Sequence, residues 1–159
     1  HMIADQHGDP LAVRISEQFL HQRIRGIGEG QRMEPVLRYG VHHPKLLRIL
    51  LMMEWNIECP LPVSEIARIA GISERQMHRL FQDKLGESPS RFYLGIRLER
   101  AAQLLAQSDL SVVEIAYACG FSSGSHLSTR FKRRFGQSPR DFRRDSTLNY
   151  GSDAGGTGI

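Results

Sequence analysis

The chain has 159 residues, of which 40% are hydrophobic and 24% charged, and its formal net charge is +4. This length suits one domain or two small helical lobes. No stretch approaches the roughly 20 apolar residues that a membrane-spanning helix needs, and no signal peptide is visible, so we expect no membrane role. The two cysteines have no partner at metal-ligand spacing, and free thiols suit a reducing compartment. We therefore expect a cytoplasmic protein without a metal site or other cofactor.

The first predicted element is an amphipathic helix over about residues 11–25. Asp9-Pro10 supplies an N-cap and a first helical residue. Three apolar residues then recur at helical spacing: Leu11, Ile15 and Phe19. Glycines and polar residues follow and predict a linker. We therefore assign residues 1–43 to an N-terminal helix and linker that precede the main domain.

Pro44 opens a second helix, over about residues 45–58, which is apolar on nearly every side and is therefore predicted to be buried. A short helix, a turn at Gly71 and another short helix follow. Ser73 and Gln76 have the spacing of a capping box at the start of this last helix. Gly86 is the expected end of the helix, because glycine is common just past helix C-termini.

Ser88-Pro89 then predicts the start of a long helix over about residues 89–106, which is ~27 Å long at ~1.5 Å per residue. A second helix–turn–helix pattern follows it, with its turn at Gly120, and a last short helix begins at Ser138-Pro139. The remaining residues, 146–159, are rich in glycine and offer little to bury, so they are predicted to be disordered.

Residues 63–92 and 112–142 repeat one pattern. Six residues of the first copy, up to Ser73, recur 49 positions later, the last as Ser122. One residue is then inserted, and five further residues recur 50 positions later. Such a repeat is one supersecondary unit used twice, and its layout is that of a helix-turn-helix. The sequence predicts an all-α fold in which two helix-turn-helix lobes, 44–88 and 108–145, are joined by the long linker helix, with the extra N-terminal helix in front.

Positive charge is concentrated in the second copy. Residues 45–145 contain 16 Lys and Arg against 11 Asp and Glu, a net of +5, whereas residues 1–44 contain five of each. Residues 121–145 alone contain seven against two, which is again +5. Such a cluster is typical of a surface that faces a polyanion, although a solvated basic face has the same composition.

In a helix-turn-helix, the second helix enters the major groove and presents its N-terminal residues to base edges. We expect base contacts from the outward polar residues of both second helices: Arg75, Gln76, His78, Arg79, Ser125, Ser128 and Thr129. Capping serines and basic residues are expected to contact phosphates: Ser73, Ser123, Arg130, Lys132, Arg133, Arg134 and Arg140. Gly124 shares the outward face but has no side chain with which to contact a base.

Two other classes of function remain open. A helical adaptor would use the same outer faces for protein partners, and a steep loss of binding with rising salt would favour DNA over this alternative. An enzyme would need a polar pocket, and the sequence offers no set of residues to build one, so we expect no catalytic activity. The aromatic residues fall on buried helix faces, which disfavours RNA binding by base stacking.

The two units and the helix between them resemble the AraC/XylS family of bacterial transcription regulators. The resemblance covers about residues 44–144 and is densest in VEIAYACGF (Val113–Phe121) and FKRRFG (Phe131–Gly136). It implies seven helices in two lobes, whose second helices enter two successive major-groove segments on one face of operator DNA. Family base-contacting positions map onto Arg75, His78, Arg79, Gly124, Ser125, Ser128 and Thr129.

The segment before the lobes, including QFLHQRIR (residues 18–25), is similar to one subgroup of that family. In this subgroup the DNA-binding domain follows a domain that resembles class I glutamine amidotransferases, and several members regulate the catabolism of amino acids, betaines or related amines. The resemblance therefore implies a monomeric fragment of an activator of a catabolic operon. The full-length protein would be a dimer with RNA polymerase as a partner.

Overall fold

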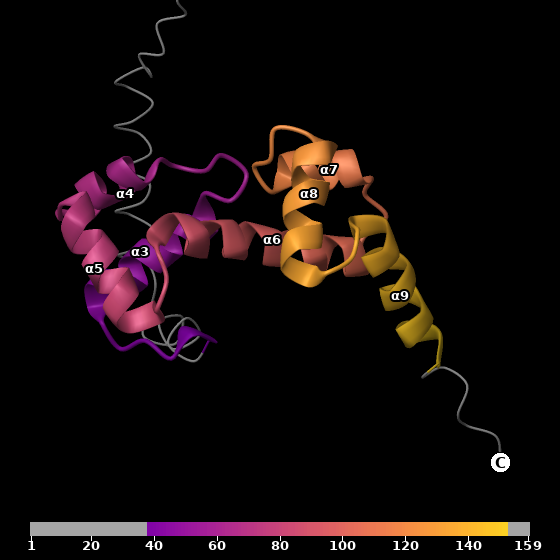
Figure 1. Cartoon of the computed structure of the whole chain (residues 1–159), viewed down its shortest axis with the longest axis horizontal. Coiled ribbons are helices and arrows are strands. Elements are labelled where there is room, and N and C mark those ends of the chain that lie inside the picture. The colour runs from indigo at the N-terminus through magenta and orange to yellow at the C-terminus, as the bar shows by residue number, and fades with distance from the viewer. Residues whose placement is uncertain (1–37, 153–159) are drawn as a thin grey trace, which may run out of the picture. The chain divides into compact units, whose positions relative to one another are not determined.

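The computed structural model describes residues 38–152, which form helices and connecting turns with no strand in that range (Figure 1). This confirms the predicted all-α class, and the predicted order of elements holds throughout the described part. The predicted helix over residues 11–25 lies outside the described residues. The helices are α3 (Pro44–Trp55), α4 (Val63–Ala70), α5 (Glu74–Leu85), α6 (Pro89–Gln107), α7 (Val112–Ala118), α8 (Gly124–Phe135) and α9 (Pro139–Ser152).

The described chain divides into two compact units. The first contains residues up to Met52 together with Val63–Gly86, and the second contains Met53–Pro62 together with everything from Glu87 onward. The long helix α6 therefore belongs to the second unit, and so does the segment 53–62, although this segment precedes the first helix-turn-helix in the sequence.

The first unit has a core formed by one face of each of its helices. α3 buries one face as part of this core, but Lys45 and Arg48 are exposed, and the helix ends at Trp55, three residues before the predicted end. The Leu46 N–H donates to His43 Nδ1 at 3.3 Å, so the histidine before Pro44 caps the helix. The buried apolar residues of this unit include Val41, Leu46, Ile49, Leu50, Ile66, Ala67, Met77 and Phe81.

The second unit has its core between α6, α7, α8 and α9. Phe131 on α8 is fully buried, and its ring centroid lies 4.5 Å from that of Phe135 and 5.3 Å from that of Phe142. Cys119 is also fully buried, and burial raises the pKa of its thiol to about 11. The remaining buried members of this cluster are Leu98, Ala101, Leu105, Ile115, Ala116, Phe121 and Leu127.

The segment 53–62 is attached to α6 by one tyrosine. The Tyr93 hydroxyl donates to the Asn56 carbonyl oxygen at 2.6 Å and accepts from the Leu61 N–H at 3.3 Å. Only 5% of Tyr93 is exposed, and burial raises the pKa of its hydroxyl to about 12. Buried polar groups need partners, so these two bonds hold both ends of the segment to the second unit.

The last helix is longer than predicted. We expected a short helix and a disordered tail from residue 146, but α9 continues to Ser152. The hydroxyls of Ser146 and Thr147 donate to the carbonyl oxygens four residues earlier, at 2.8 and 3.0 Å. Between Pro139 and Gly151 the sequence contains no glycine or proline, so nothing interrupts the helix that Phe142 anchors to the core.

Candidate nucleic-acid interface

The start of α5 is fixed by a complete capping box. Ser73 Oγ accepts the Gln76 N–H at 3.1 Å, and Gln76 Oε1 accepts the Ser73 N–H at 2.9 Å. Met77 and Phe81 are fully buried and set the rotation of the helix about its axis. Arg75, Gln76, His78 and Arg79 are consequently exposed, as base contacts require, but the amide oxygen of Gln76 already has a partner within the cap.

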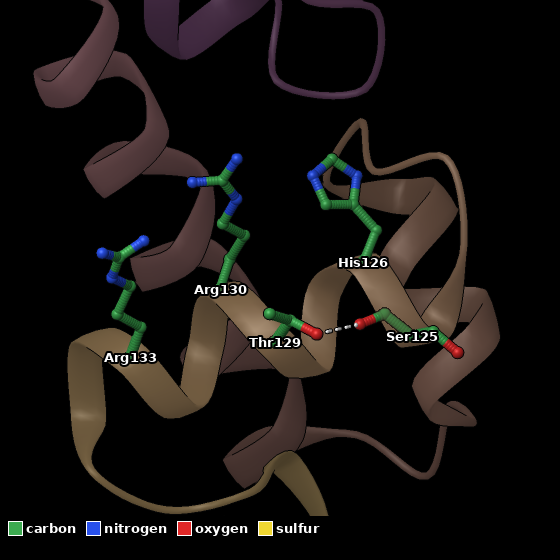
Figure 2. Close-up of a pocket in the computed structure, with 5 residues that line it drawn as sticks. All are labelled: Ser125, His126, Thr129, Arg130 and Arg133. Atoms are coloured by element: carbon green, nitrogen blue, oxygen red, sulfur yellow. Dashed lines mark hydrogen bonds between the residues drawn. The ribbon is translucent and has the colours of Figure 1, made fainter.

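The second unit presents α8 in the same way. Ser123 Oγ accepts the His126 N–H at 3.0 Å, and Leu127 is fully buried. Ser125 and Thr129 are exposed, whereas Ser128 is half-buried. The Thr129 hydroxyl donates to the Ser125 carbonyl oxygen at 3.0 Å (Figure 2). The predicted base-contacting residues of α8 therefore reach the surface to different extents.

Gly124 has a packing role at the start of α8. A Cβ atom built on Gly124 would lie 3.2 Å from Val113 Cγ2, which is tighter than most real Cβ contacts. The small residue lets the start of α8 approach the start of α7 closely. The missing side chain at this outward position of α8 thus has a structural explanation.

The position of the inserted residue differs from the prediction. The sequence pairs Ser73 with Ser122, but the residue that caps α8 is Ser123, so the insertion lies within the turn before the cap. Both caps belong to the predicted phosphate-contacting set, and they are equivalent at an offset of 50. With this alignment, His126 occupies the position that corresponds to Gln76.

His126 is a candidate contact that the sequence reasoning missed. Its Nδ1 lies 3.1 Å from Ser122 Oγ, and its ring meets the Phe121 ring edge-on at 5.5 Å. The side chain is exposed and lines a shallow pocket of about 420 Å³ with Ser125, Thr129, Arg130 and Arg133 (Figure 2). The offset of 50 from Gln76 is the sequence signal that would have identified it.

The predicted phosphate-contacting cations differ in their surroundings. Arg130, Lys132, Arg133 and Arg140 are exposed on the second unit. Arg134 is less available, because its guanidinium pairs with Glu99 Oε1 at 2.8 Å and lies 5.8 Å from the centre of the Phe135 ring.

Two further arginines of the second unit stabilise its fold. Arg143 donates to the carbonyl oxygens of Leu105 and Leu110, near the end of α6. Arg97 donates to the carbonyl oxygens of Cys119 and Gly120 at 2.9 and 2.6 Å. Its guanidinium carbon also lies 4.4 Å from the centre of the Phe121 ring. Both side chains are thus held by backbone groups.

Between residues 38 and 152, no group of three or more His, Cys, Asp or Glu side chains could hold a metal ion. Within the same range, no helix is both long and apolar enough to cross a membrane.

Two helix-turn-helix units, each with a capped second helix whose polar side chains face outward, define a DNA-binding protein. The helix-turn-helix domain family matches residues 66–145. The transcriptional regulator CdhR of Pseudomonas aeruginosa is 46% identical over 138 residues, which are 87% of this chain and 41% of CdhR. The chain belongs to the AraC family of transcription regulators, and it is a DNA-binding domain without enzymatic activity.

Solved structures agree with this assignment. An AraC-type transcriptional regulator from Chromobacterium violaceum is 48% identical, with a TM-score of 0.63 over 65% of this chain and 92% of that protein. The DNA-binding domain of AdpA, a global transcriptional factor solved with a target DNA, is 29% identical. Its TM-score is 0.64, over 67% of this chain and 96% of that domain. The chain spans about two fifths of the length of the curated relative CdhR.

Proposed function

We propose that this chain recognises a specific operator through α5 and α8, which enter two adjacent major-groove segments on one face of the double helix. The observation that carries the proposal is the matched presentation of the two helices. Each begins at a capping serine, buries residues at equivalent positions and exposes polar side chains near its N-terminus.

Within this proposal the two helices have different tasks. α5 offers the long donors Arg75, His78 and Arg79, and arginine can form two hydrogen bonds with guanine. α8 offers the short side chains Ser125, Ser128 and Thr129, close to exposed cations. We therefore assign most base discrimination to the first unit and much of the backbone affinity to the second.

The role of the full-length protein is part of the same proposal. The match to CdhR extends over 87% of this chain, well beyond the helix-turn-helix domain, which supports the subgroup with an amidotransferase-like sensor domain. We propose that the full-length protein is a cytoplasmic activator of a catabolic operon and that it acts on RNA polymerase. We further propose that the full-length protein is a dimer, whereas the present chain binds DNA as a monomer. The free thiols of Cys59 and Cys119 support a reducing compartment.

Selection of bound sequences from random duplex DNA tests the proposal directly. We expect a preferred sequence with two conserved blocks about one helical turn apart, and a footprint of the monomer over two adjacent major-groove segments on one face. Affinity should fall steeply as salt rises, because phosphate contacts release counterions. No preferred sequence, protection of a single segment, or protection on opposite faces would contradict it.

A further inference from the structure

We propose that a groove between α6 and α8 binds phosphates of the DNA backbone, which makes α6 part of the interface as well as the connection between the lobes. The inference rests on the proposed function and adds residues of α6 to it. The groove lies entirely within the second unit and has a volume of about 840 Å³. Five arginines line it: Arg91, Arg97, Arg130, Arg133 and Arg134.

Three of these arginines are available to a ligand. Arg97 and Arg134 are held by the contacts described above, so they form part of the wall. The Arg91 side chain is 81% exposed, and its contact with Glu87 Oε2 is long, at 3.8 Å. An exposed pair of this kind is weak in water. Among residues 38–152, no carboxylate lies within ion-pairing distance of Arg130 or Arg133, and both are exposed.

The basic residues lie along one edge of the exposed face of α8. His126, Arg130 and Arg133 are spaced four and three residues apart, so they lie on one side of the helix. Figure 2 shows their side chains extending from that side, away from Ser125 and Thr129. The major groove is ~12 Å wide and a helix with its side chains is ~10–12 Å across, so the sides of an inserted helix face the phosphates. The edge of this exposed face that carries Ser125 can therefore meet bases, while the edge that carries Arg130 meets the backbone.

The first turn of α6 completes the groove. Ser90 and Arg91 line the groove from this turn. Pro89 has no N–H and the Arg91 N–H donates to Ser88 Oγ at 3.3 Å, so this turn contributes the Arg91 side chain, the Ser90 N–H and the helix dipole, which favours an anion. A phosphate in the groove would therefore meet the Arg91 guanidinium on one side and the cations of α8 on the other.

The charge of the groove is specific to the second unit. The residues of α5 that correspond to Arg130 and Arg133 are Leu80 and Asp83, at the offset of 50. Neither is a cation. The shared fold therefore does not require a cation at either position, so the two arginines are not explained by the architecture that both units share.

The test compares Arg91→Ala and Arg133→Ala with Arg100→Ala. Arg100 is an exposed arginine on α6 that does not line the groove, so it is a matched control for charge and helix. Affinity for the selected duplex is measured over a range of salt. We expect each groove variant to bind on the order of tenfold more weakly and to reduce the salt slope by about one unit, with base preferences unchanged. Arg100→Ala should show neither effect. Circular dichroism verifies that all three variants are folded.

Duplexes with single methylphosphonate substitutions identify the source of the phosphate. The wild type should lose affinity at one or two backbone positions, and Arg91→Ala should be insensitive to the same substitutions. Inorganic phosphate is the second arm. If Arg91→Ala abolishes competition by inorganic phosphate but leaves DNA affinity and salt slope intact, the groove is a small-anion site and the inference is wrong. Equal salt slopes for Arg91→Ala, Arg133→Ala and Arg100→Ala would also overturn it.

These outcomes separate the inference from the proposed function. If the wild type selects no preferred duplex, the proposed function fails, and the inference fails with it. If the wild type selects a duplex but the groove variants behave like Arg100→Ala, only the inference fails. A change of base preference in Arg91→Ala would assign this residue to base contacts and likewise contradict a backbone role.

Discussion

Gly120 is the position where a single added methyl group should be most damaging. Its φ of +76° places it in the left-handed region, and a Cβ atom there would lie 2.4 Å from the Ile57 carbonyl oxygen and 2.5 Å from Pro60 Cγ. These neighbours are backbone and a proline ring, so no side-chain rotation can relieve the clash. Gly120→Ala must therefore displace the 53–62 segment or distort the turn of the second helix-turn-helix.

The expected cost has two parts. A non-glycine residue in the left-handed conformation costs ~1–2 kcal/mol. Forcing extra atoms into a packed site costs a further ~1–3 kcal/mol. Gly71, the equivalent turn residue of the first unit, has a φ of +70° but no neighbour within 4 Å of its Cβ position. Gly71→Ala should therefore carry only the first cost, and we expect Gly120→Ala to be more destabilising by about 1–3 kcal/mol.

Urea unfolding of the two variants measures this difference. Trp55 is the single tryptophan of the chain and lies in the segment that Gly120 approaches, so its fluorescence reports the second unit, while circular dichroism reports both units. Gly120→Ala should lower the urea midpoint of the fluorescence transition by more than Gly71→Ala lowers the midpoint of the first unit, followed by circular dichroism. If the two shifts are equal, the close approach between Gly120 and the 53–62 segment does not exist in solution.

Three further predictions concern the core, the reading of bases and pH. Leu98 and Leu105 are 2% and 1% exposed, so truncating either to alanine should cost ~2–5 kcal/mol, and an unchanged thermal midpoint would contradict the packing of α6. Arg79→Ala should cost about 1–3 kcal/mol at particular base pairs in an operator scan, whereas an even loss over all sequences would assign Arg79 to phosphates. Glu114 accepts the Ser111 N–H at 2.7 Å, and this bond lowers the pKa of its carboxyl below the usual 4.5. The ionised Glu114 carboxylate therefore stabilises the folded state fully above pH 4.5, and this contribution is lost as pH falls through the lowered pKa. Glu114→Gln should accordingly flatten the dependence of the thermal midpoint on pH in that acidic range.

The local signals in the sequence predicted most of the fold. Both capping boxes are confirmed, because a cap is formed by residues three positions apart and leaves its pattern in the chain. The inserted residue was expected after the cap rather than in the turn before it, since Ser122 and Ser123 are equally good caps by composition. The predicted end of α9 is too early because the prediction rests on the glycines after residue 150 and not on the absence of a helix breaker before them.

The surroundings of the candidate site could not be predicted in the same way. The partner of Arg134 is 35 residues away in the chain, and one partner of Arg143 is 38 residues away. Such contacts depend on the packing of α6 against α8 and α9, which no local pattern encodes. The close approach between Gly124 and Val113 likewise involves a residue of another helix. The base and phosphate contacts themselves stay predictions until operator DNA is tested.

The attachment of residues 53–62 to α6 limits how the lobes can be exchanged between relatives. The chain passes from one unit to the other three times, after Met52, after Pro62 and after Gly86. A chimera joined at Gly86 would combine α6–α9 of one parent with the 53–62 segment of the other. Tyr93 and Gly120 would then contact the segment of the other parent, whose carbonyl groups and proline fit that parent's own second unit. To exchange the second lobe, the ten residues 53–62 must therefore be exchanged together with α6–α9, although they lie within the first lobe in the sequence. A single crossover, which the order of the lobes in the sequence suggests, is not enough.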